Sequence, residues 1–250
     1  MRTVRDTLSL LRSVCWMIPM LLATTAAMGA LSLLSSLIDS RGGLQHRIAR
    51  AWGRMLMAIF LVRVRVRGAA SLQDGRACVF ASNHFSLIDT PLMFGFLPVP
   101  FRVLARAGLW QIPFIGWHLN RAGHLPVDRQ NPRRAARNVA QAARKVQSGR
   151  SILVFPEGGR RRSDQARRFK TGAAHIAIRS GAPLVPVAIA GTRAVLPPGS
   201  WHLRPGAVEL RIGSPIETAP GEARSAIDLT RRLTSEVARL AELPAYAGPG

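Results

Sequence analysis

The chain has 250 residues, enough for one globular domain with an appendage, and its hydrophobic fraction of 48% is high for a soluble domain. Its net charge is +22, and all but Lys145 and Lys170 of the 35 basic residues are arginines, so we expect anionic partners, either nucleic acid or phospholipid headgroups. The two cysteines, Cys15 and Cys78, exclude a disulfide framework and favour a reducing compartment.

Residues 1–60 are predicted to form a membrane-associated two-helix segment. Residues 14–38 carry no charge, a length that suits a helix in a bilayer core, and Pro19 allows a kink. Arginines flank this span on both sides, so charge does not orient it across a membrane. An in-plane hairpin is favoured, with Gly42 and Gly43 as its turn and residues 44–62 as its second helix. The alternative is a single transmembrane helix.

Residues 61–243 are predicted to form one α/β domain, followed by a flexible tail at 244–250. Valine alternates with arginine from Val62 to Arg67, which is typical of a strand with one buried face. Further strands are expected at 77–81, 101–105, 123–129, 151–155, 183–189 and 207–212. Helices are expected at 90–96, at 131–149, at 172–179 and over the stripe Leu229, Leu233, Val237 and Leu240. This alternation predicts a largely parallel mixed sheet flanked by helices.

A histidine and an aspartate five positions apart, His84 and Asp89, follow the expected strand at 77–81. Histidine takes up a proton near neutral pH, and a carboxylate on its other ring nitrogen fixes the tautomer and stabilises the imidazolium. The nearby hydroxyls of Ser86 and Thr90 do not lie in a G-x-S-x-G nucleophile elbow, so the attacking hydroxyl is expected to belong to the substrate. The alternative is a helix-capping pair, with Asn83 as the cap and Asp89 solvated.

A second polar segment, Pro-Glu-Gly-Gly-Arg at residues 156–160, follows the expected strand at 151–155. A glycine pair beside an arginine lets the backbone approach an anion closely. The arginines that come next in the chain form either a solvated loop or a headgroup contact. The aromatic stretch at 109–117 belongs either to the core or to the lining of an acyl-chain groove.

Four separated blocks together resemble the bacterial 1-acyl-glycerol-3-phosphate acyltransferases, a family of glycerolipid acyltransferases with an N-H-x-x-x-x-D motif. The resemblance extends over residues 60–217. The matching blocks are Asn83-His84 with Asp89, Gly123 with Val127-Asp128-Arg129, Phe155-Pro156-Glu157-Gly158 with Arg160, and Pro183-Leu184-Val185-Pro186-Val187. The chain departs from the family pattern at Gly159, where a threonine is usual, and at Gly108, where a glutamate is usual. Neither departure touches the His-Asp pair, so the reaction class is better determined than the acceptor.

The resemblance implies transfer of a fatty acyl group from a thioester to the sn-2 hydroxyl of 1-acyl-glycerol-3-phosphate, which gives phosphatidic acid. His84 and Asp89 are then the catalytic pair, and backbone N–H groups near Gly158 would stabilise the oxyanion. Glu157 is expected to position an arginine or the glycerol hydroxyls. The residues expected to bind substrate are Asn83, Arg106, Arg129, Glu157, Gly158 and Arg160. No metal or bound cofactor is required, and the expected location is the cytoplasmic face of the inner membrane.

The acyl donor stays open between acyl-CoA and acyl-carrier protein, because both are anionic. A relative that acylates another lysolipid, such as one containing an amino acid, is one alternative, for which Gly159 and the arginine surplus are the hints. A basic nucleic-acid-binding protein is the alternative from a different class. The scarcity of lysine, the lack of an RNA-type aromatic motif and the uncharged N-terminal span favour lipid over nucleic acid as the partner.

Overall fold

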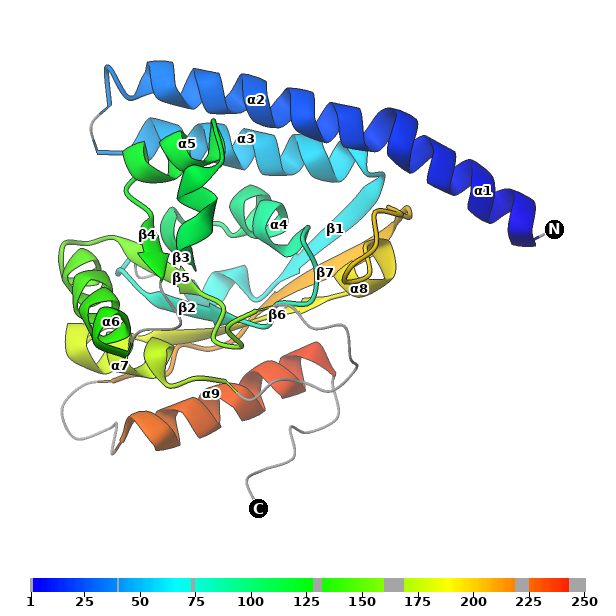
Figure 1. The fold of residues 1–250 in the computed structure, drawn as a ribbon. Helices are drawn as coiled ribbons and strands as arrows, with labels where there is room; N and C mark the ends of the chain where they lie inside the picture. The colour runs from blue at the N-terminus through cyan, green and yellow to red at the C-terminus, as the bar shows by residue number, and fades with distance from the viewer. Residues whose placement is uncertain are drawn as a thin grey trace.

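The computed structural model describes residues 2–39, 41–72, 75–127, 132–159, 169–218 and 225–242. Within them seven strands form one sheet in the order β1-β7-β6-β2-β5-β3-β4 (Figure 1). Neighbouring strands are parallel except β6 and β7, which are antiparallel, so the predicted largely parallel mixed sheet is confirmed. The strands are β1 (Val62–Arg67), β2 (Val79–Ser82), β3 (Phe101–Arg106), β4 (Leu125–Val127), β5 (Ser151–Val154), β6 (Leu184–Ala190) and β7 (Gly206–Ile212).

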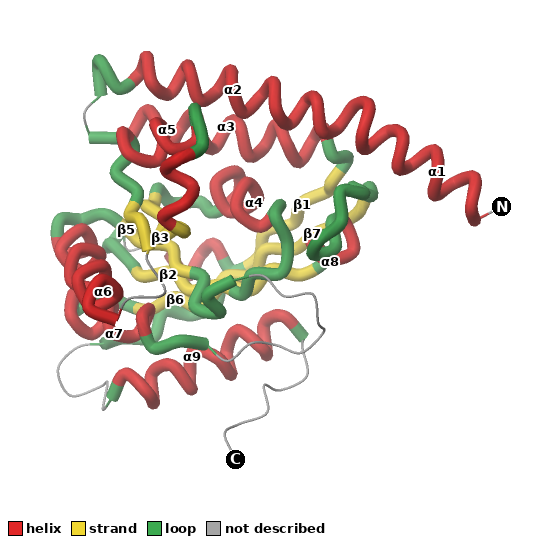
Figure 2. Tube along the Cα trace, in the orientation of Figure 1, coloured by secondary structure: helices red, strands yellow, loops and turns green. Residues whose placement is uncertain are grey.

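Helices cover both faces of this sheet (Figures 1 and 2). The helices α6, α7 and α9 lie on one face, whereas α3 and α4, with α2 and α5 outside them, lie on the other. Their bounds are α3 (Gly43–Ile59), α4 (Asp89–Phe96), α5 (Ile115–Arg121), α6 (Pro132–Gln147), α7 (Gly172–Ser180) and α9 (Ala226–Ala241). The helix α5, the single turn α8 (Thr192–Val195) and the 3-10 turns Ala69–Leu72 and Ala107–Gln111 were not predicted.

The sheet separates two hydrophobic cores. Along β2, Phe80 packs in the core beneath α3 and α4, whereas Val79 and Ala81 pack in the core beneath α7 and α9. Because both faces are covered, the central strands β2, β5 and β6 are nearly continuous apolar runs. The edge strand β1 differs, since only Val62 is buried there and its arginines are exposed, which discourages pairing with another chain.

The N-terminal segment forms two long helices that run in opposite directions (Figure 1). The first comprises α1 (Arg2–Arg12), a π-helical turn (Ser13–Met17) and α2 (Ile18–Ser35), and the second is α3. A proline ring inside a helix clashes with the carbonyl four residues earlier, and the wider π turn directly before Pro19 relieves this clash without breaking the helix. The predicted kink at Pro19 is therefore expressed as a π turn.

The second helix is shorter than predicted. The chain turns at Gly42, whose φ is +78°, and Gly43 is already the first residue of α3. The helix ends at Ile59 instead of continuing to Val62, because Leu61 adopts a positive φ of 56° and Val62 pairs with Gly206 in the sheet.

The first helix lies along the α/β domain and does not project from it. Trp52 of α3 donates through Nε1 to Thr25 Oγ1 at 3.1 Å, and Ser32 Oγ bonds to His118 Nδ1 of α5 at 2.6 Å. At the other end, Ser13 Oγ bonds to the backbone of Leu203. The contacts at Ser13 and Ser32 lie about 28 Å apart along the helix axis, since a helix rises about 1.5 Å per residue.

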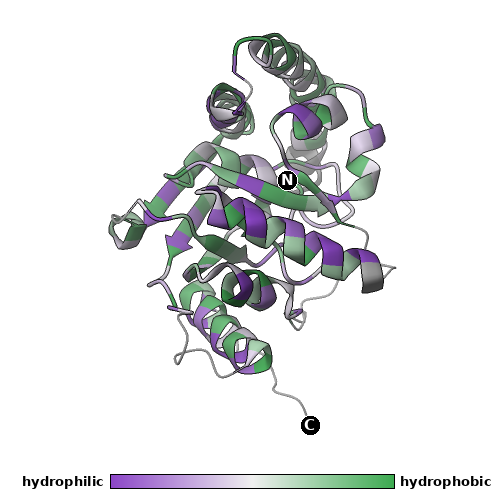
Figure 3. Cartoon of the chain, turned by 90° about the vertical axis from the view of Figure 1, so that its left-hand side faces the viewer, coloured by the Kyte–Doolittle hydropathy of each residue, from purple (hydrophilic) through white to green (hydrophobic). Residues whose placement is uncertain are grey.

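The opposite side of this helix is apolar and exposed. Leu22 and Leu34 are each 64% exposed, and the helix is mostly hydrophobic where it is seen nearly end-on at the top of Figure 3. Among the described residues it is the one helix, Thr7–Ser35, that is long and apolar enough to cross a membrane, by length and composition alone.

Candidate active site

The candidate site lies where the parallel strands β2, β5 and β3 end. Parallel neighbours end at the same edge of a sheet, so residues that follow these strands come close together. His84 comes two residues after β2, Phe155 and Glu157 follow β5, and Arg106 is the last residue of β3. Segments that are more than 70 residues apart in sequence therefore meet here, as the resemblance implied.

His84 and Asp89 form a buried pair, as predicted. His84 Nδ1 lies 2.9 Å from Asp89 Oδ2, and the carboxylate is fully buried. The same oxygen accepts hydrogen bonds from the backbone N–H groups of Phe85 at 2.7 Å and Ser86 at 2.8 Å. Three donors on one oxygen hold the loop before α4 in a single shape. The alternative in which Asn83 is the helix cap and Asp89 is solvated is therefore wrong for Asp89, which is fully buried.

This geometry leaves one imidazole nitrogen for chemistry. An ionised carboxylate only accepts hydrogen bonds, so the neutral imidazole of His84 carries its proton on Nδ1 and presents Nε2 as an acceptor. No described residue bonds to Nε2, and the side chain keeps 14% of its surface exposed. The ring of Phe155 stacks on the imidazole, with ring centroids 4.2 Å apart and planes 23° from parallel. The ring of His84 is thus held on its edge by Asp89 and on one face by Phe155.

Two polar side chains of the motif hold the backbone and do not face a substrate. Asn83 is fully buried, and its amide exchanges hydrogen bonds of 2.8 Å with both N–H and C=O of Ile189 in β6. The expectation that Asn83 binds substrate is corrected by this geometry, because both ends of the amide are already used. Ser86 Oγ is also buried and donates to the carbonyl of Leu196 at 2.7 Å, so it is not placed as a nucleophile.

Glu157 contacts the loop that carries His84 directly. Its side chain is 2% exposed, and Oε1 accepts the backbone N–H of His84 at 3.2 Å. Glu157 therefore positions the backbone of His84, a contact that we did not predict. That it also positions an arginine or the glycerol hydroxyls stays a prediction. Gly158 has a φ of +73°, and its N–H donates to the Phe155 carbonyl at 3.2 Å. That N–H closes the turn, so an oxyanion donor supplied by other backbone N–H groups near Gly158 stays a prediction.

The cations of the site are only partly described. Arg106 is exposed at the end of β3, two strands away from β2, which is about 10 Å at the usual strand spacing. The predicted substrate-binding residues Arg129 and Arg160 lie outside the described residues. Sequence reasoning missed Lys170, whose Nζ lies 3.5 Å from the position that a Cβ on Gly158 would occupy. The signal available for Lys170 was that it is one of only two lysines in an arginine-rich chain.

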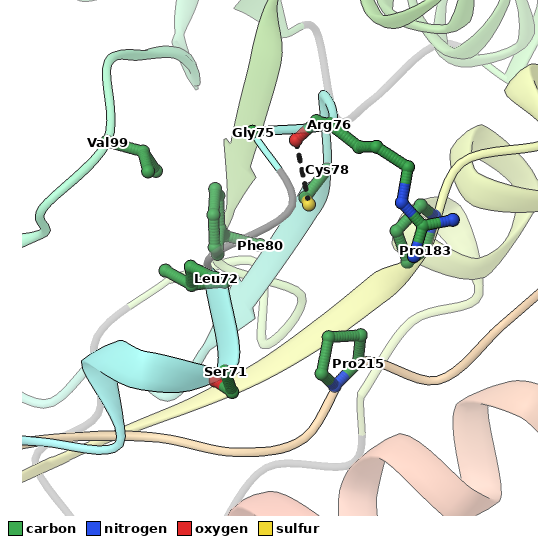
Figure 4. Close-up of a pocket in the computed structure, with 9 residues that line it drawn as sticks. All are labelled: Ser71, Leu72, Gly75, Arg76, Cys78, Phe80, Val99, Pro183 and Pro215. Carbon is green, nitrogen blue, oxygen red and sulfur yellow. Dashed lines mark hydrogen bonds between the residues drawn. The ribbon is translucent and has the colours of Figure 1, made fainter.

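A small cavity lies at the opposite end of the strands (Figure 4). It is lined by Cys78 and Phe80 at the start of β2, with Pro183 and Pro215, and its volume of about 20 Å³ holds about one water molecule. This cavity is too small for a lipid and is unrelated to His84. Within the described chain, no group of three or more His, Cys, Asp or Glu side chains is arranged to hold a metal ion.

Comparison with known proteins gives consistent matches. The acyltransferase family model matches residues 63–190. A chloroplastic 1-acyl-sn-glycerol-3-phosphate acyltransferase of Brassica napus is 32% identical over 68% of this chain and 50% of its own length. A 1-acyl-sn-glycerol-3-phosphate acyltransferase of Pseudomonas aeruginosa is 32% identical over 72% of this chain and 70% of its own length. The chain spans about half the length of the first of these relatives.

A solved structure extends the likeness to nearly the whole chain. The 1-acyl-sn-glycerophosphate (LPA) acyltransferase PlsC of Thermotoga maritima superposes with a TM-score of 0.79 at 26% identity. The superposition covers 97% of this chain and 98% of that protein.

Proposed function

The chain belongs to the acyltransferase family, and on this basis we propose that it transfers a fatty acyl group from an acyl thioester to the sn-2 hydroxyl of 1-acyl-glycerol-3-phosphate, giving phosphatidic acid. The observation that carries this proposal is the His84–Asp89 pair at the end of β2, in which Asp89 binds Nδ1 and no described residue bonds to Nε2. The hydroxyl of Ser86 in the same loop is already bonded to the Leu196 carbonyl. The names of the curated relatives and of the solved neighbour support the choice of acceptor.

In the proposed reaction His84 acts as a general base. Nε2 takes the proton of the acceptor hydroxyl as its oxygen forms a bond to the thioester carbonyl carbon. The resulting imidazolium is stabilised by the negative charge of Asp89 at Nδ1. When the tetrahedral intermediate collapses, the carbon–sulfur bond breaks, the thiolate takes the proton back from Nε2, and an ester and a free thiol result. The proposed chemistry uses no metal and no bound cofactor.

We assign the phosphate of the acceptor to the cations at this edge of the sheet. Arg106 and Lys170 come from β3 and from the segment before α7, and we add Arg129 and Arg160 on the strength of the family motif. Each charge-assisted hydrogen bond contributes about 1.5–3 kcal/mol. Arg160→Ala should therefore raise the KM for the acceptor with a smaller change in kcat.

We propose that the chain associates with one membrane leaflet through its N-terminal hairpin. The first helix is bonded to the α/β domain at points about 28 Å apart, close to the thickness of a bilayer core, which is about 30 Å. If it crossed the membrane, the charged domain held beside it would have to enter the hydrocarbon. An orientation parallel to the membrane surface avoids this and presents Leu22 and Leu34 to lipid. We propose the cytoplasmic face of the inner membrane as the location, as the family resemblance implies.

The test is transfer of a labelled acyl group to lysophosphatidic acid by the purified full chain in detergent, with acyl-CoA and acyl-carrier protein as separate donors. We expect labelled phosphatidic acid, and a fall in kcat of about 10²- to 10⁴-fold for His84→Ala. The matched control is His175→Ala, because His175 is exposed on α7 and has no hydrogen bond to His84 or Asp89. Wild-type turnover by His84→Ala would remove the proposed base. Transfer to a different lysolipid only would overturn the acceptor and leave the reaction class standing.

A further inference from the structure

The segment between α8 and β7, residues 196–204, is bonded to the start of the first helix. Ser13 Oγ accepts the N–H of Leu203 at 3.1 Å and lies 3.0 Å from its carbonyl oxygen. Arg12 donates to the same carbonyl at 3.3 Å, and His202 Nε2 bonds to Ser9 Oγ at 2.9 Å. Ser13 is fully buried and belongs to the π turn. We call this contact the helix–loop junction, and Figure 1 shows both segments at the same end of the molecule.

The segment is folded and not merely extended, so its exposed side chains are held in place. The backbone N–H of Arg204 donates to the Val195 carbonyl at 2.8 Å, and that of Ser200 donates to the Pro197 carbonyl at 3.1 Å. The side chain of Leu203, within this segment, is buried. The loop therefore presents a defined outer surface.

That outer surface is aromatic and basic. Trp201 is 64% exposed, although it lies two residues from the buried Leu203. Across the helix–loop junction, Trp16 is 58% exposed and Leu11 is 53% exposed, and Arg204 is also exposed. Exposed tryptophan and arginine in one short segment are typical of the membrane–water interface, where the indole ring lies at headgroup level and arginine binds phosphate.

The same loop also contacts the catalytic loop. Ser86 Oγ, three residues before Asp89, donates to the carbonyl of Leu196 at 2.7 Å. Leu196 is 6% exposed, so this bond lies inside the protein. One short segment thus joins the membrane-associated helix on one side to the loop that carries His84 on the other.

We propose that residues 196–204 form a second membrane contact, in which Trp201 and Arg204 bind the lipid headgroup region beside Trp16 and keep the mouth of the catalytic site at the bilayer surface. The partner is a phospholipid bilayer that contains anionic lipid. This inference rests on the membrane association proposed above, and it extends the contact from the N-terminal hairpin to the catalytic domain itself. It also explains why a large aromatic side chain is left exposed on a folded loop.

Fluorescence quenching tests the contact without relying on activity. The chain has five tryptophans. Three full-length variants each keep one of them, Trp201, Trp16 or Trp52, with the others changed to phenylalanine. They are reconstituted into vesicles of phosphatidylethanolamine and phosphatidylglycerol with brominated acyl chains. We expect strong quenching of Trp201 and Trp16 and little quenching of Trp52, which is partly buried against Thr25.

The outcomes separate the two proposals. Quenching of Trp16 without quenching of Trp201 overturns the second contact and leaves the hairpin anchor in place. If neither tryptophan is quenched, the membrane association itself is overturned.

A second measurement uses Trp201→Ser with acceptor presented in vesicles or as a water-soluble short-chain lysolipid. We expect KM to rise about tenfold with vesicles and to stay unchanged with the soluble acceptor. Ile227→Ser is the matched control, since Ile227 is 61% exposed on α9 on the far side of the sheet. An equal effect of both variants, or of both acceptors, overturns the proposal.

Discussion

The substitution Asp89→Asn removes the negative charge of Asp89 while it keeps a hydrogen-bond acceptor of the same shape. Asp89 Oδ2 accepts from His84 Nδ1 and from the backbone N–H groups of Phe85 and Ser86, at 2.7–2.9 Å. Both backbone donors need an acceptor, so asparagine should place its amide oxygen where Oδ2 stands. If the asparagine instead turned its NH2 group towards the loop, the backbone N–H groups of Phe85 and Ser86 would lose their acceptor, which costs about 1–3 kcal/mol each. We therefore expect the variant to keep the tautomer of His84 and to lose the negative charge, while its NH2 group takes the buried Oδ1 position, which has no hydrogen-bond partner among the described residues.

The size of the effect follows from Coulomb's law. A carboxylate about 4 Å from an imidazolium stabilises it by about 4 kcal/mol at an effective dielectric constant of about 20. Because proton transfer is only partly complete in the transition state, we expect a loss of about 10²- to 10³-fold in kcat, at about 1.4 kcal/mol per tenfold. The KM for the acceptor should change less than about threefold, since Asp89 is fully buried and does not reach the substrate.

The assay measures initial rates with a labelled acyl thioester and lysophosphatidic acid, and circular dichroism checks that the variant is folded. Asp89→Ala is the comparison, because it removes the acceptor as well as the charge. It should lose more activity than Asp89→Asn and should also lower the thermal midpoint. A kcat for Asp89→Asn above about one tenth of the wild-type value would refute the charge argument. Equal losses in the two variants would show that the geometry of the carboxylate contributes nothing further.

Three other predictions concern the surroundings of the site. Burial lowers the pKa of His46 and of His118 from 6.5 to about 4, so between these values the unfolded chain binds protons that the folded chain excludes, and stability falls as the pH falls. Between pH 7.5 and pH 5 the two histidines should lower the free energy of unfolding by about 4 kcal/mol, measured by urea titration. In His46→Leu this pH-dependent loss should be about half as large. A loss as large as that of the wild type would contradict the argument. Gly53→Leu should lower the free energy of unfolding by about 1–3 kcal/mol, because a Cβ at this position meets the backbone of α4. Gly172→Ala, whose Cβ would lie in open space, should leave the free energy of unfolding unchanged in the same titration. Phe155→Leu should lower kcat about tenfold with KM unchanged, since the imidazole loses the ring stacked on it; retention of full kcat would show that Asp89 alone orients His84.

Local sequence patterns predicted the strands of the sheet and the contact between His84 and Asp89, but not the helix α5. The valine–arginine alternation of β1 and the apolar runs of β5 and β6 depend only on neighbouring residues, and the observed strands begin and end within two residues of the predicted positions. His84 and Asp89 are five residues apart, so the turn that leads into α4 brings them together. A motif of this kind can be predicted from the sequence because its geometry depends on a few consecutive backbone dihedral angles.

Only the tertiary structure decided what surrounds that pair. Glu157 bonds to the N–H of His84 from 73 residues away, and the Asn83 amide pairs with Ile189 across 106 residues. Which hydrogen-bonding group meets which depends on the strand order and register of the sheet, and these follow from the packing of both cores together. The orientation of the first helix is decided in the same way. Its composition is compatible with a helix that crosses a membrane or lies parallel to its surface. Its hydrogen bonds to Leu203 and His118 hold it alongside the α/β domain.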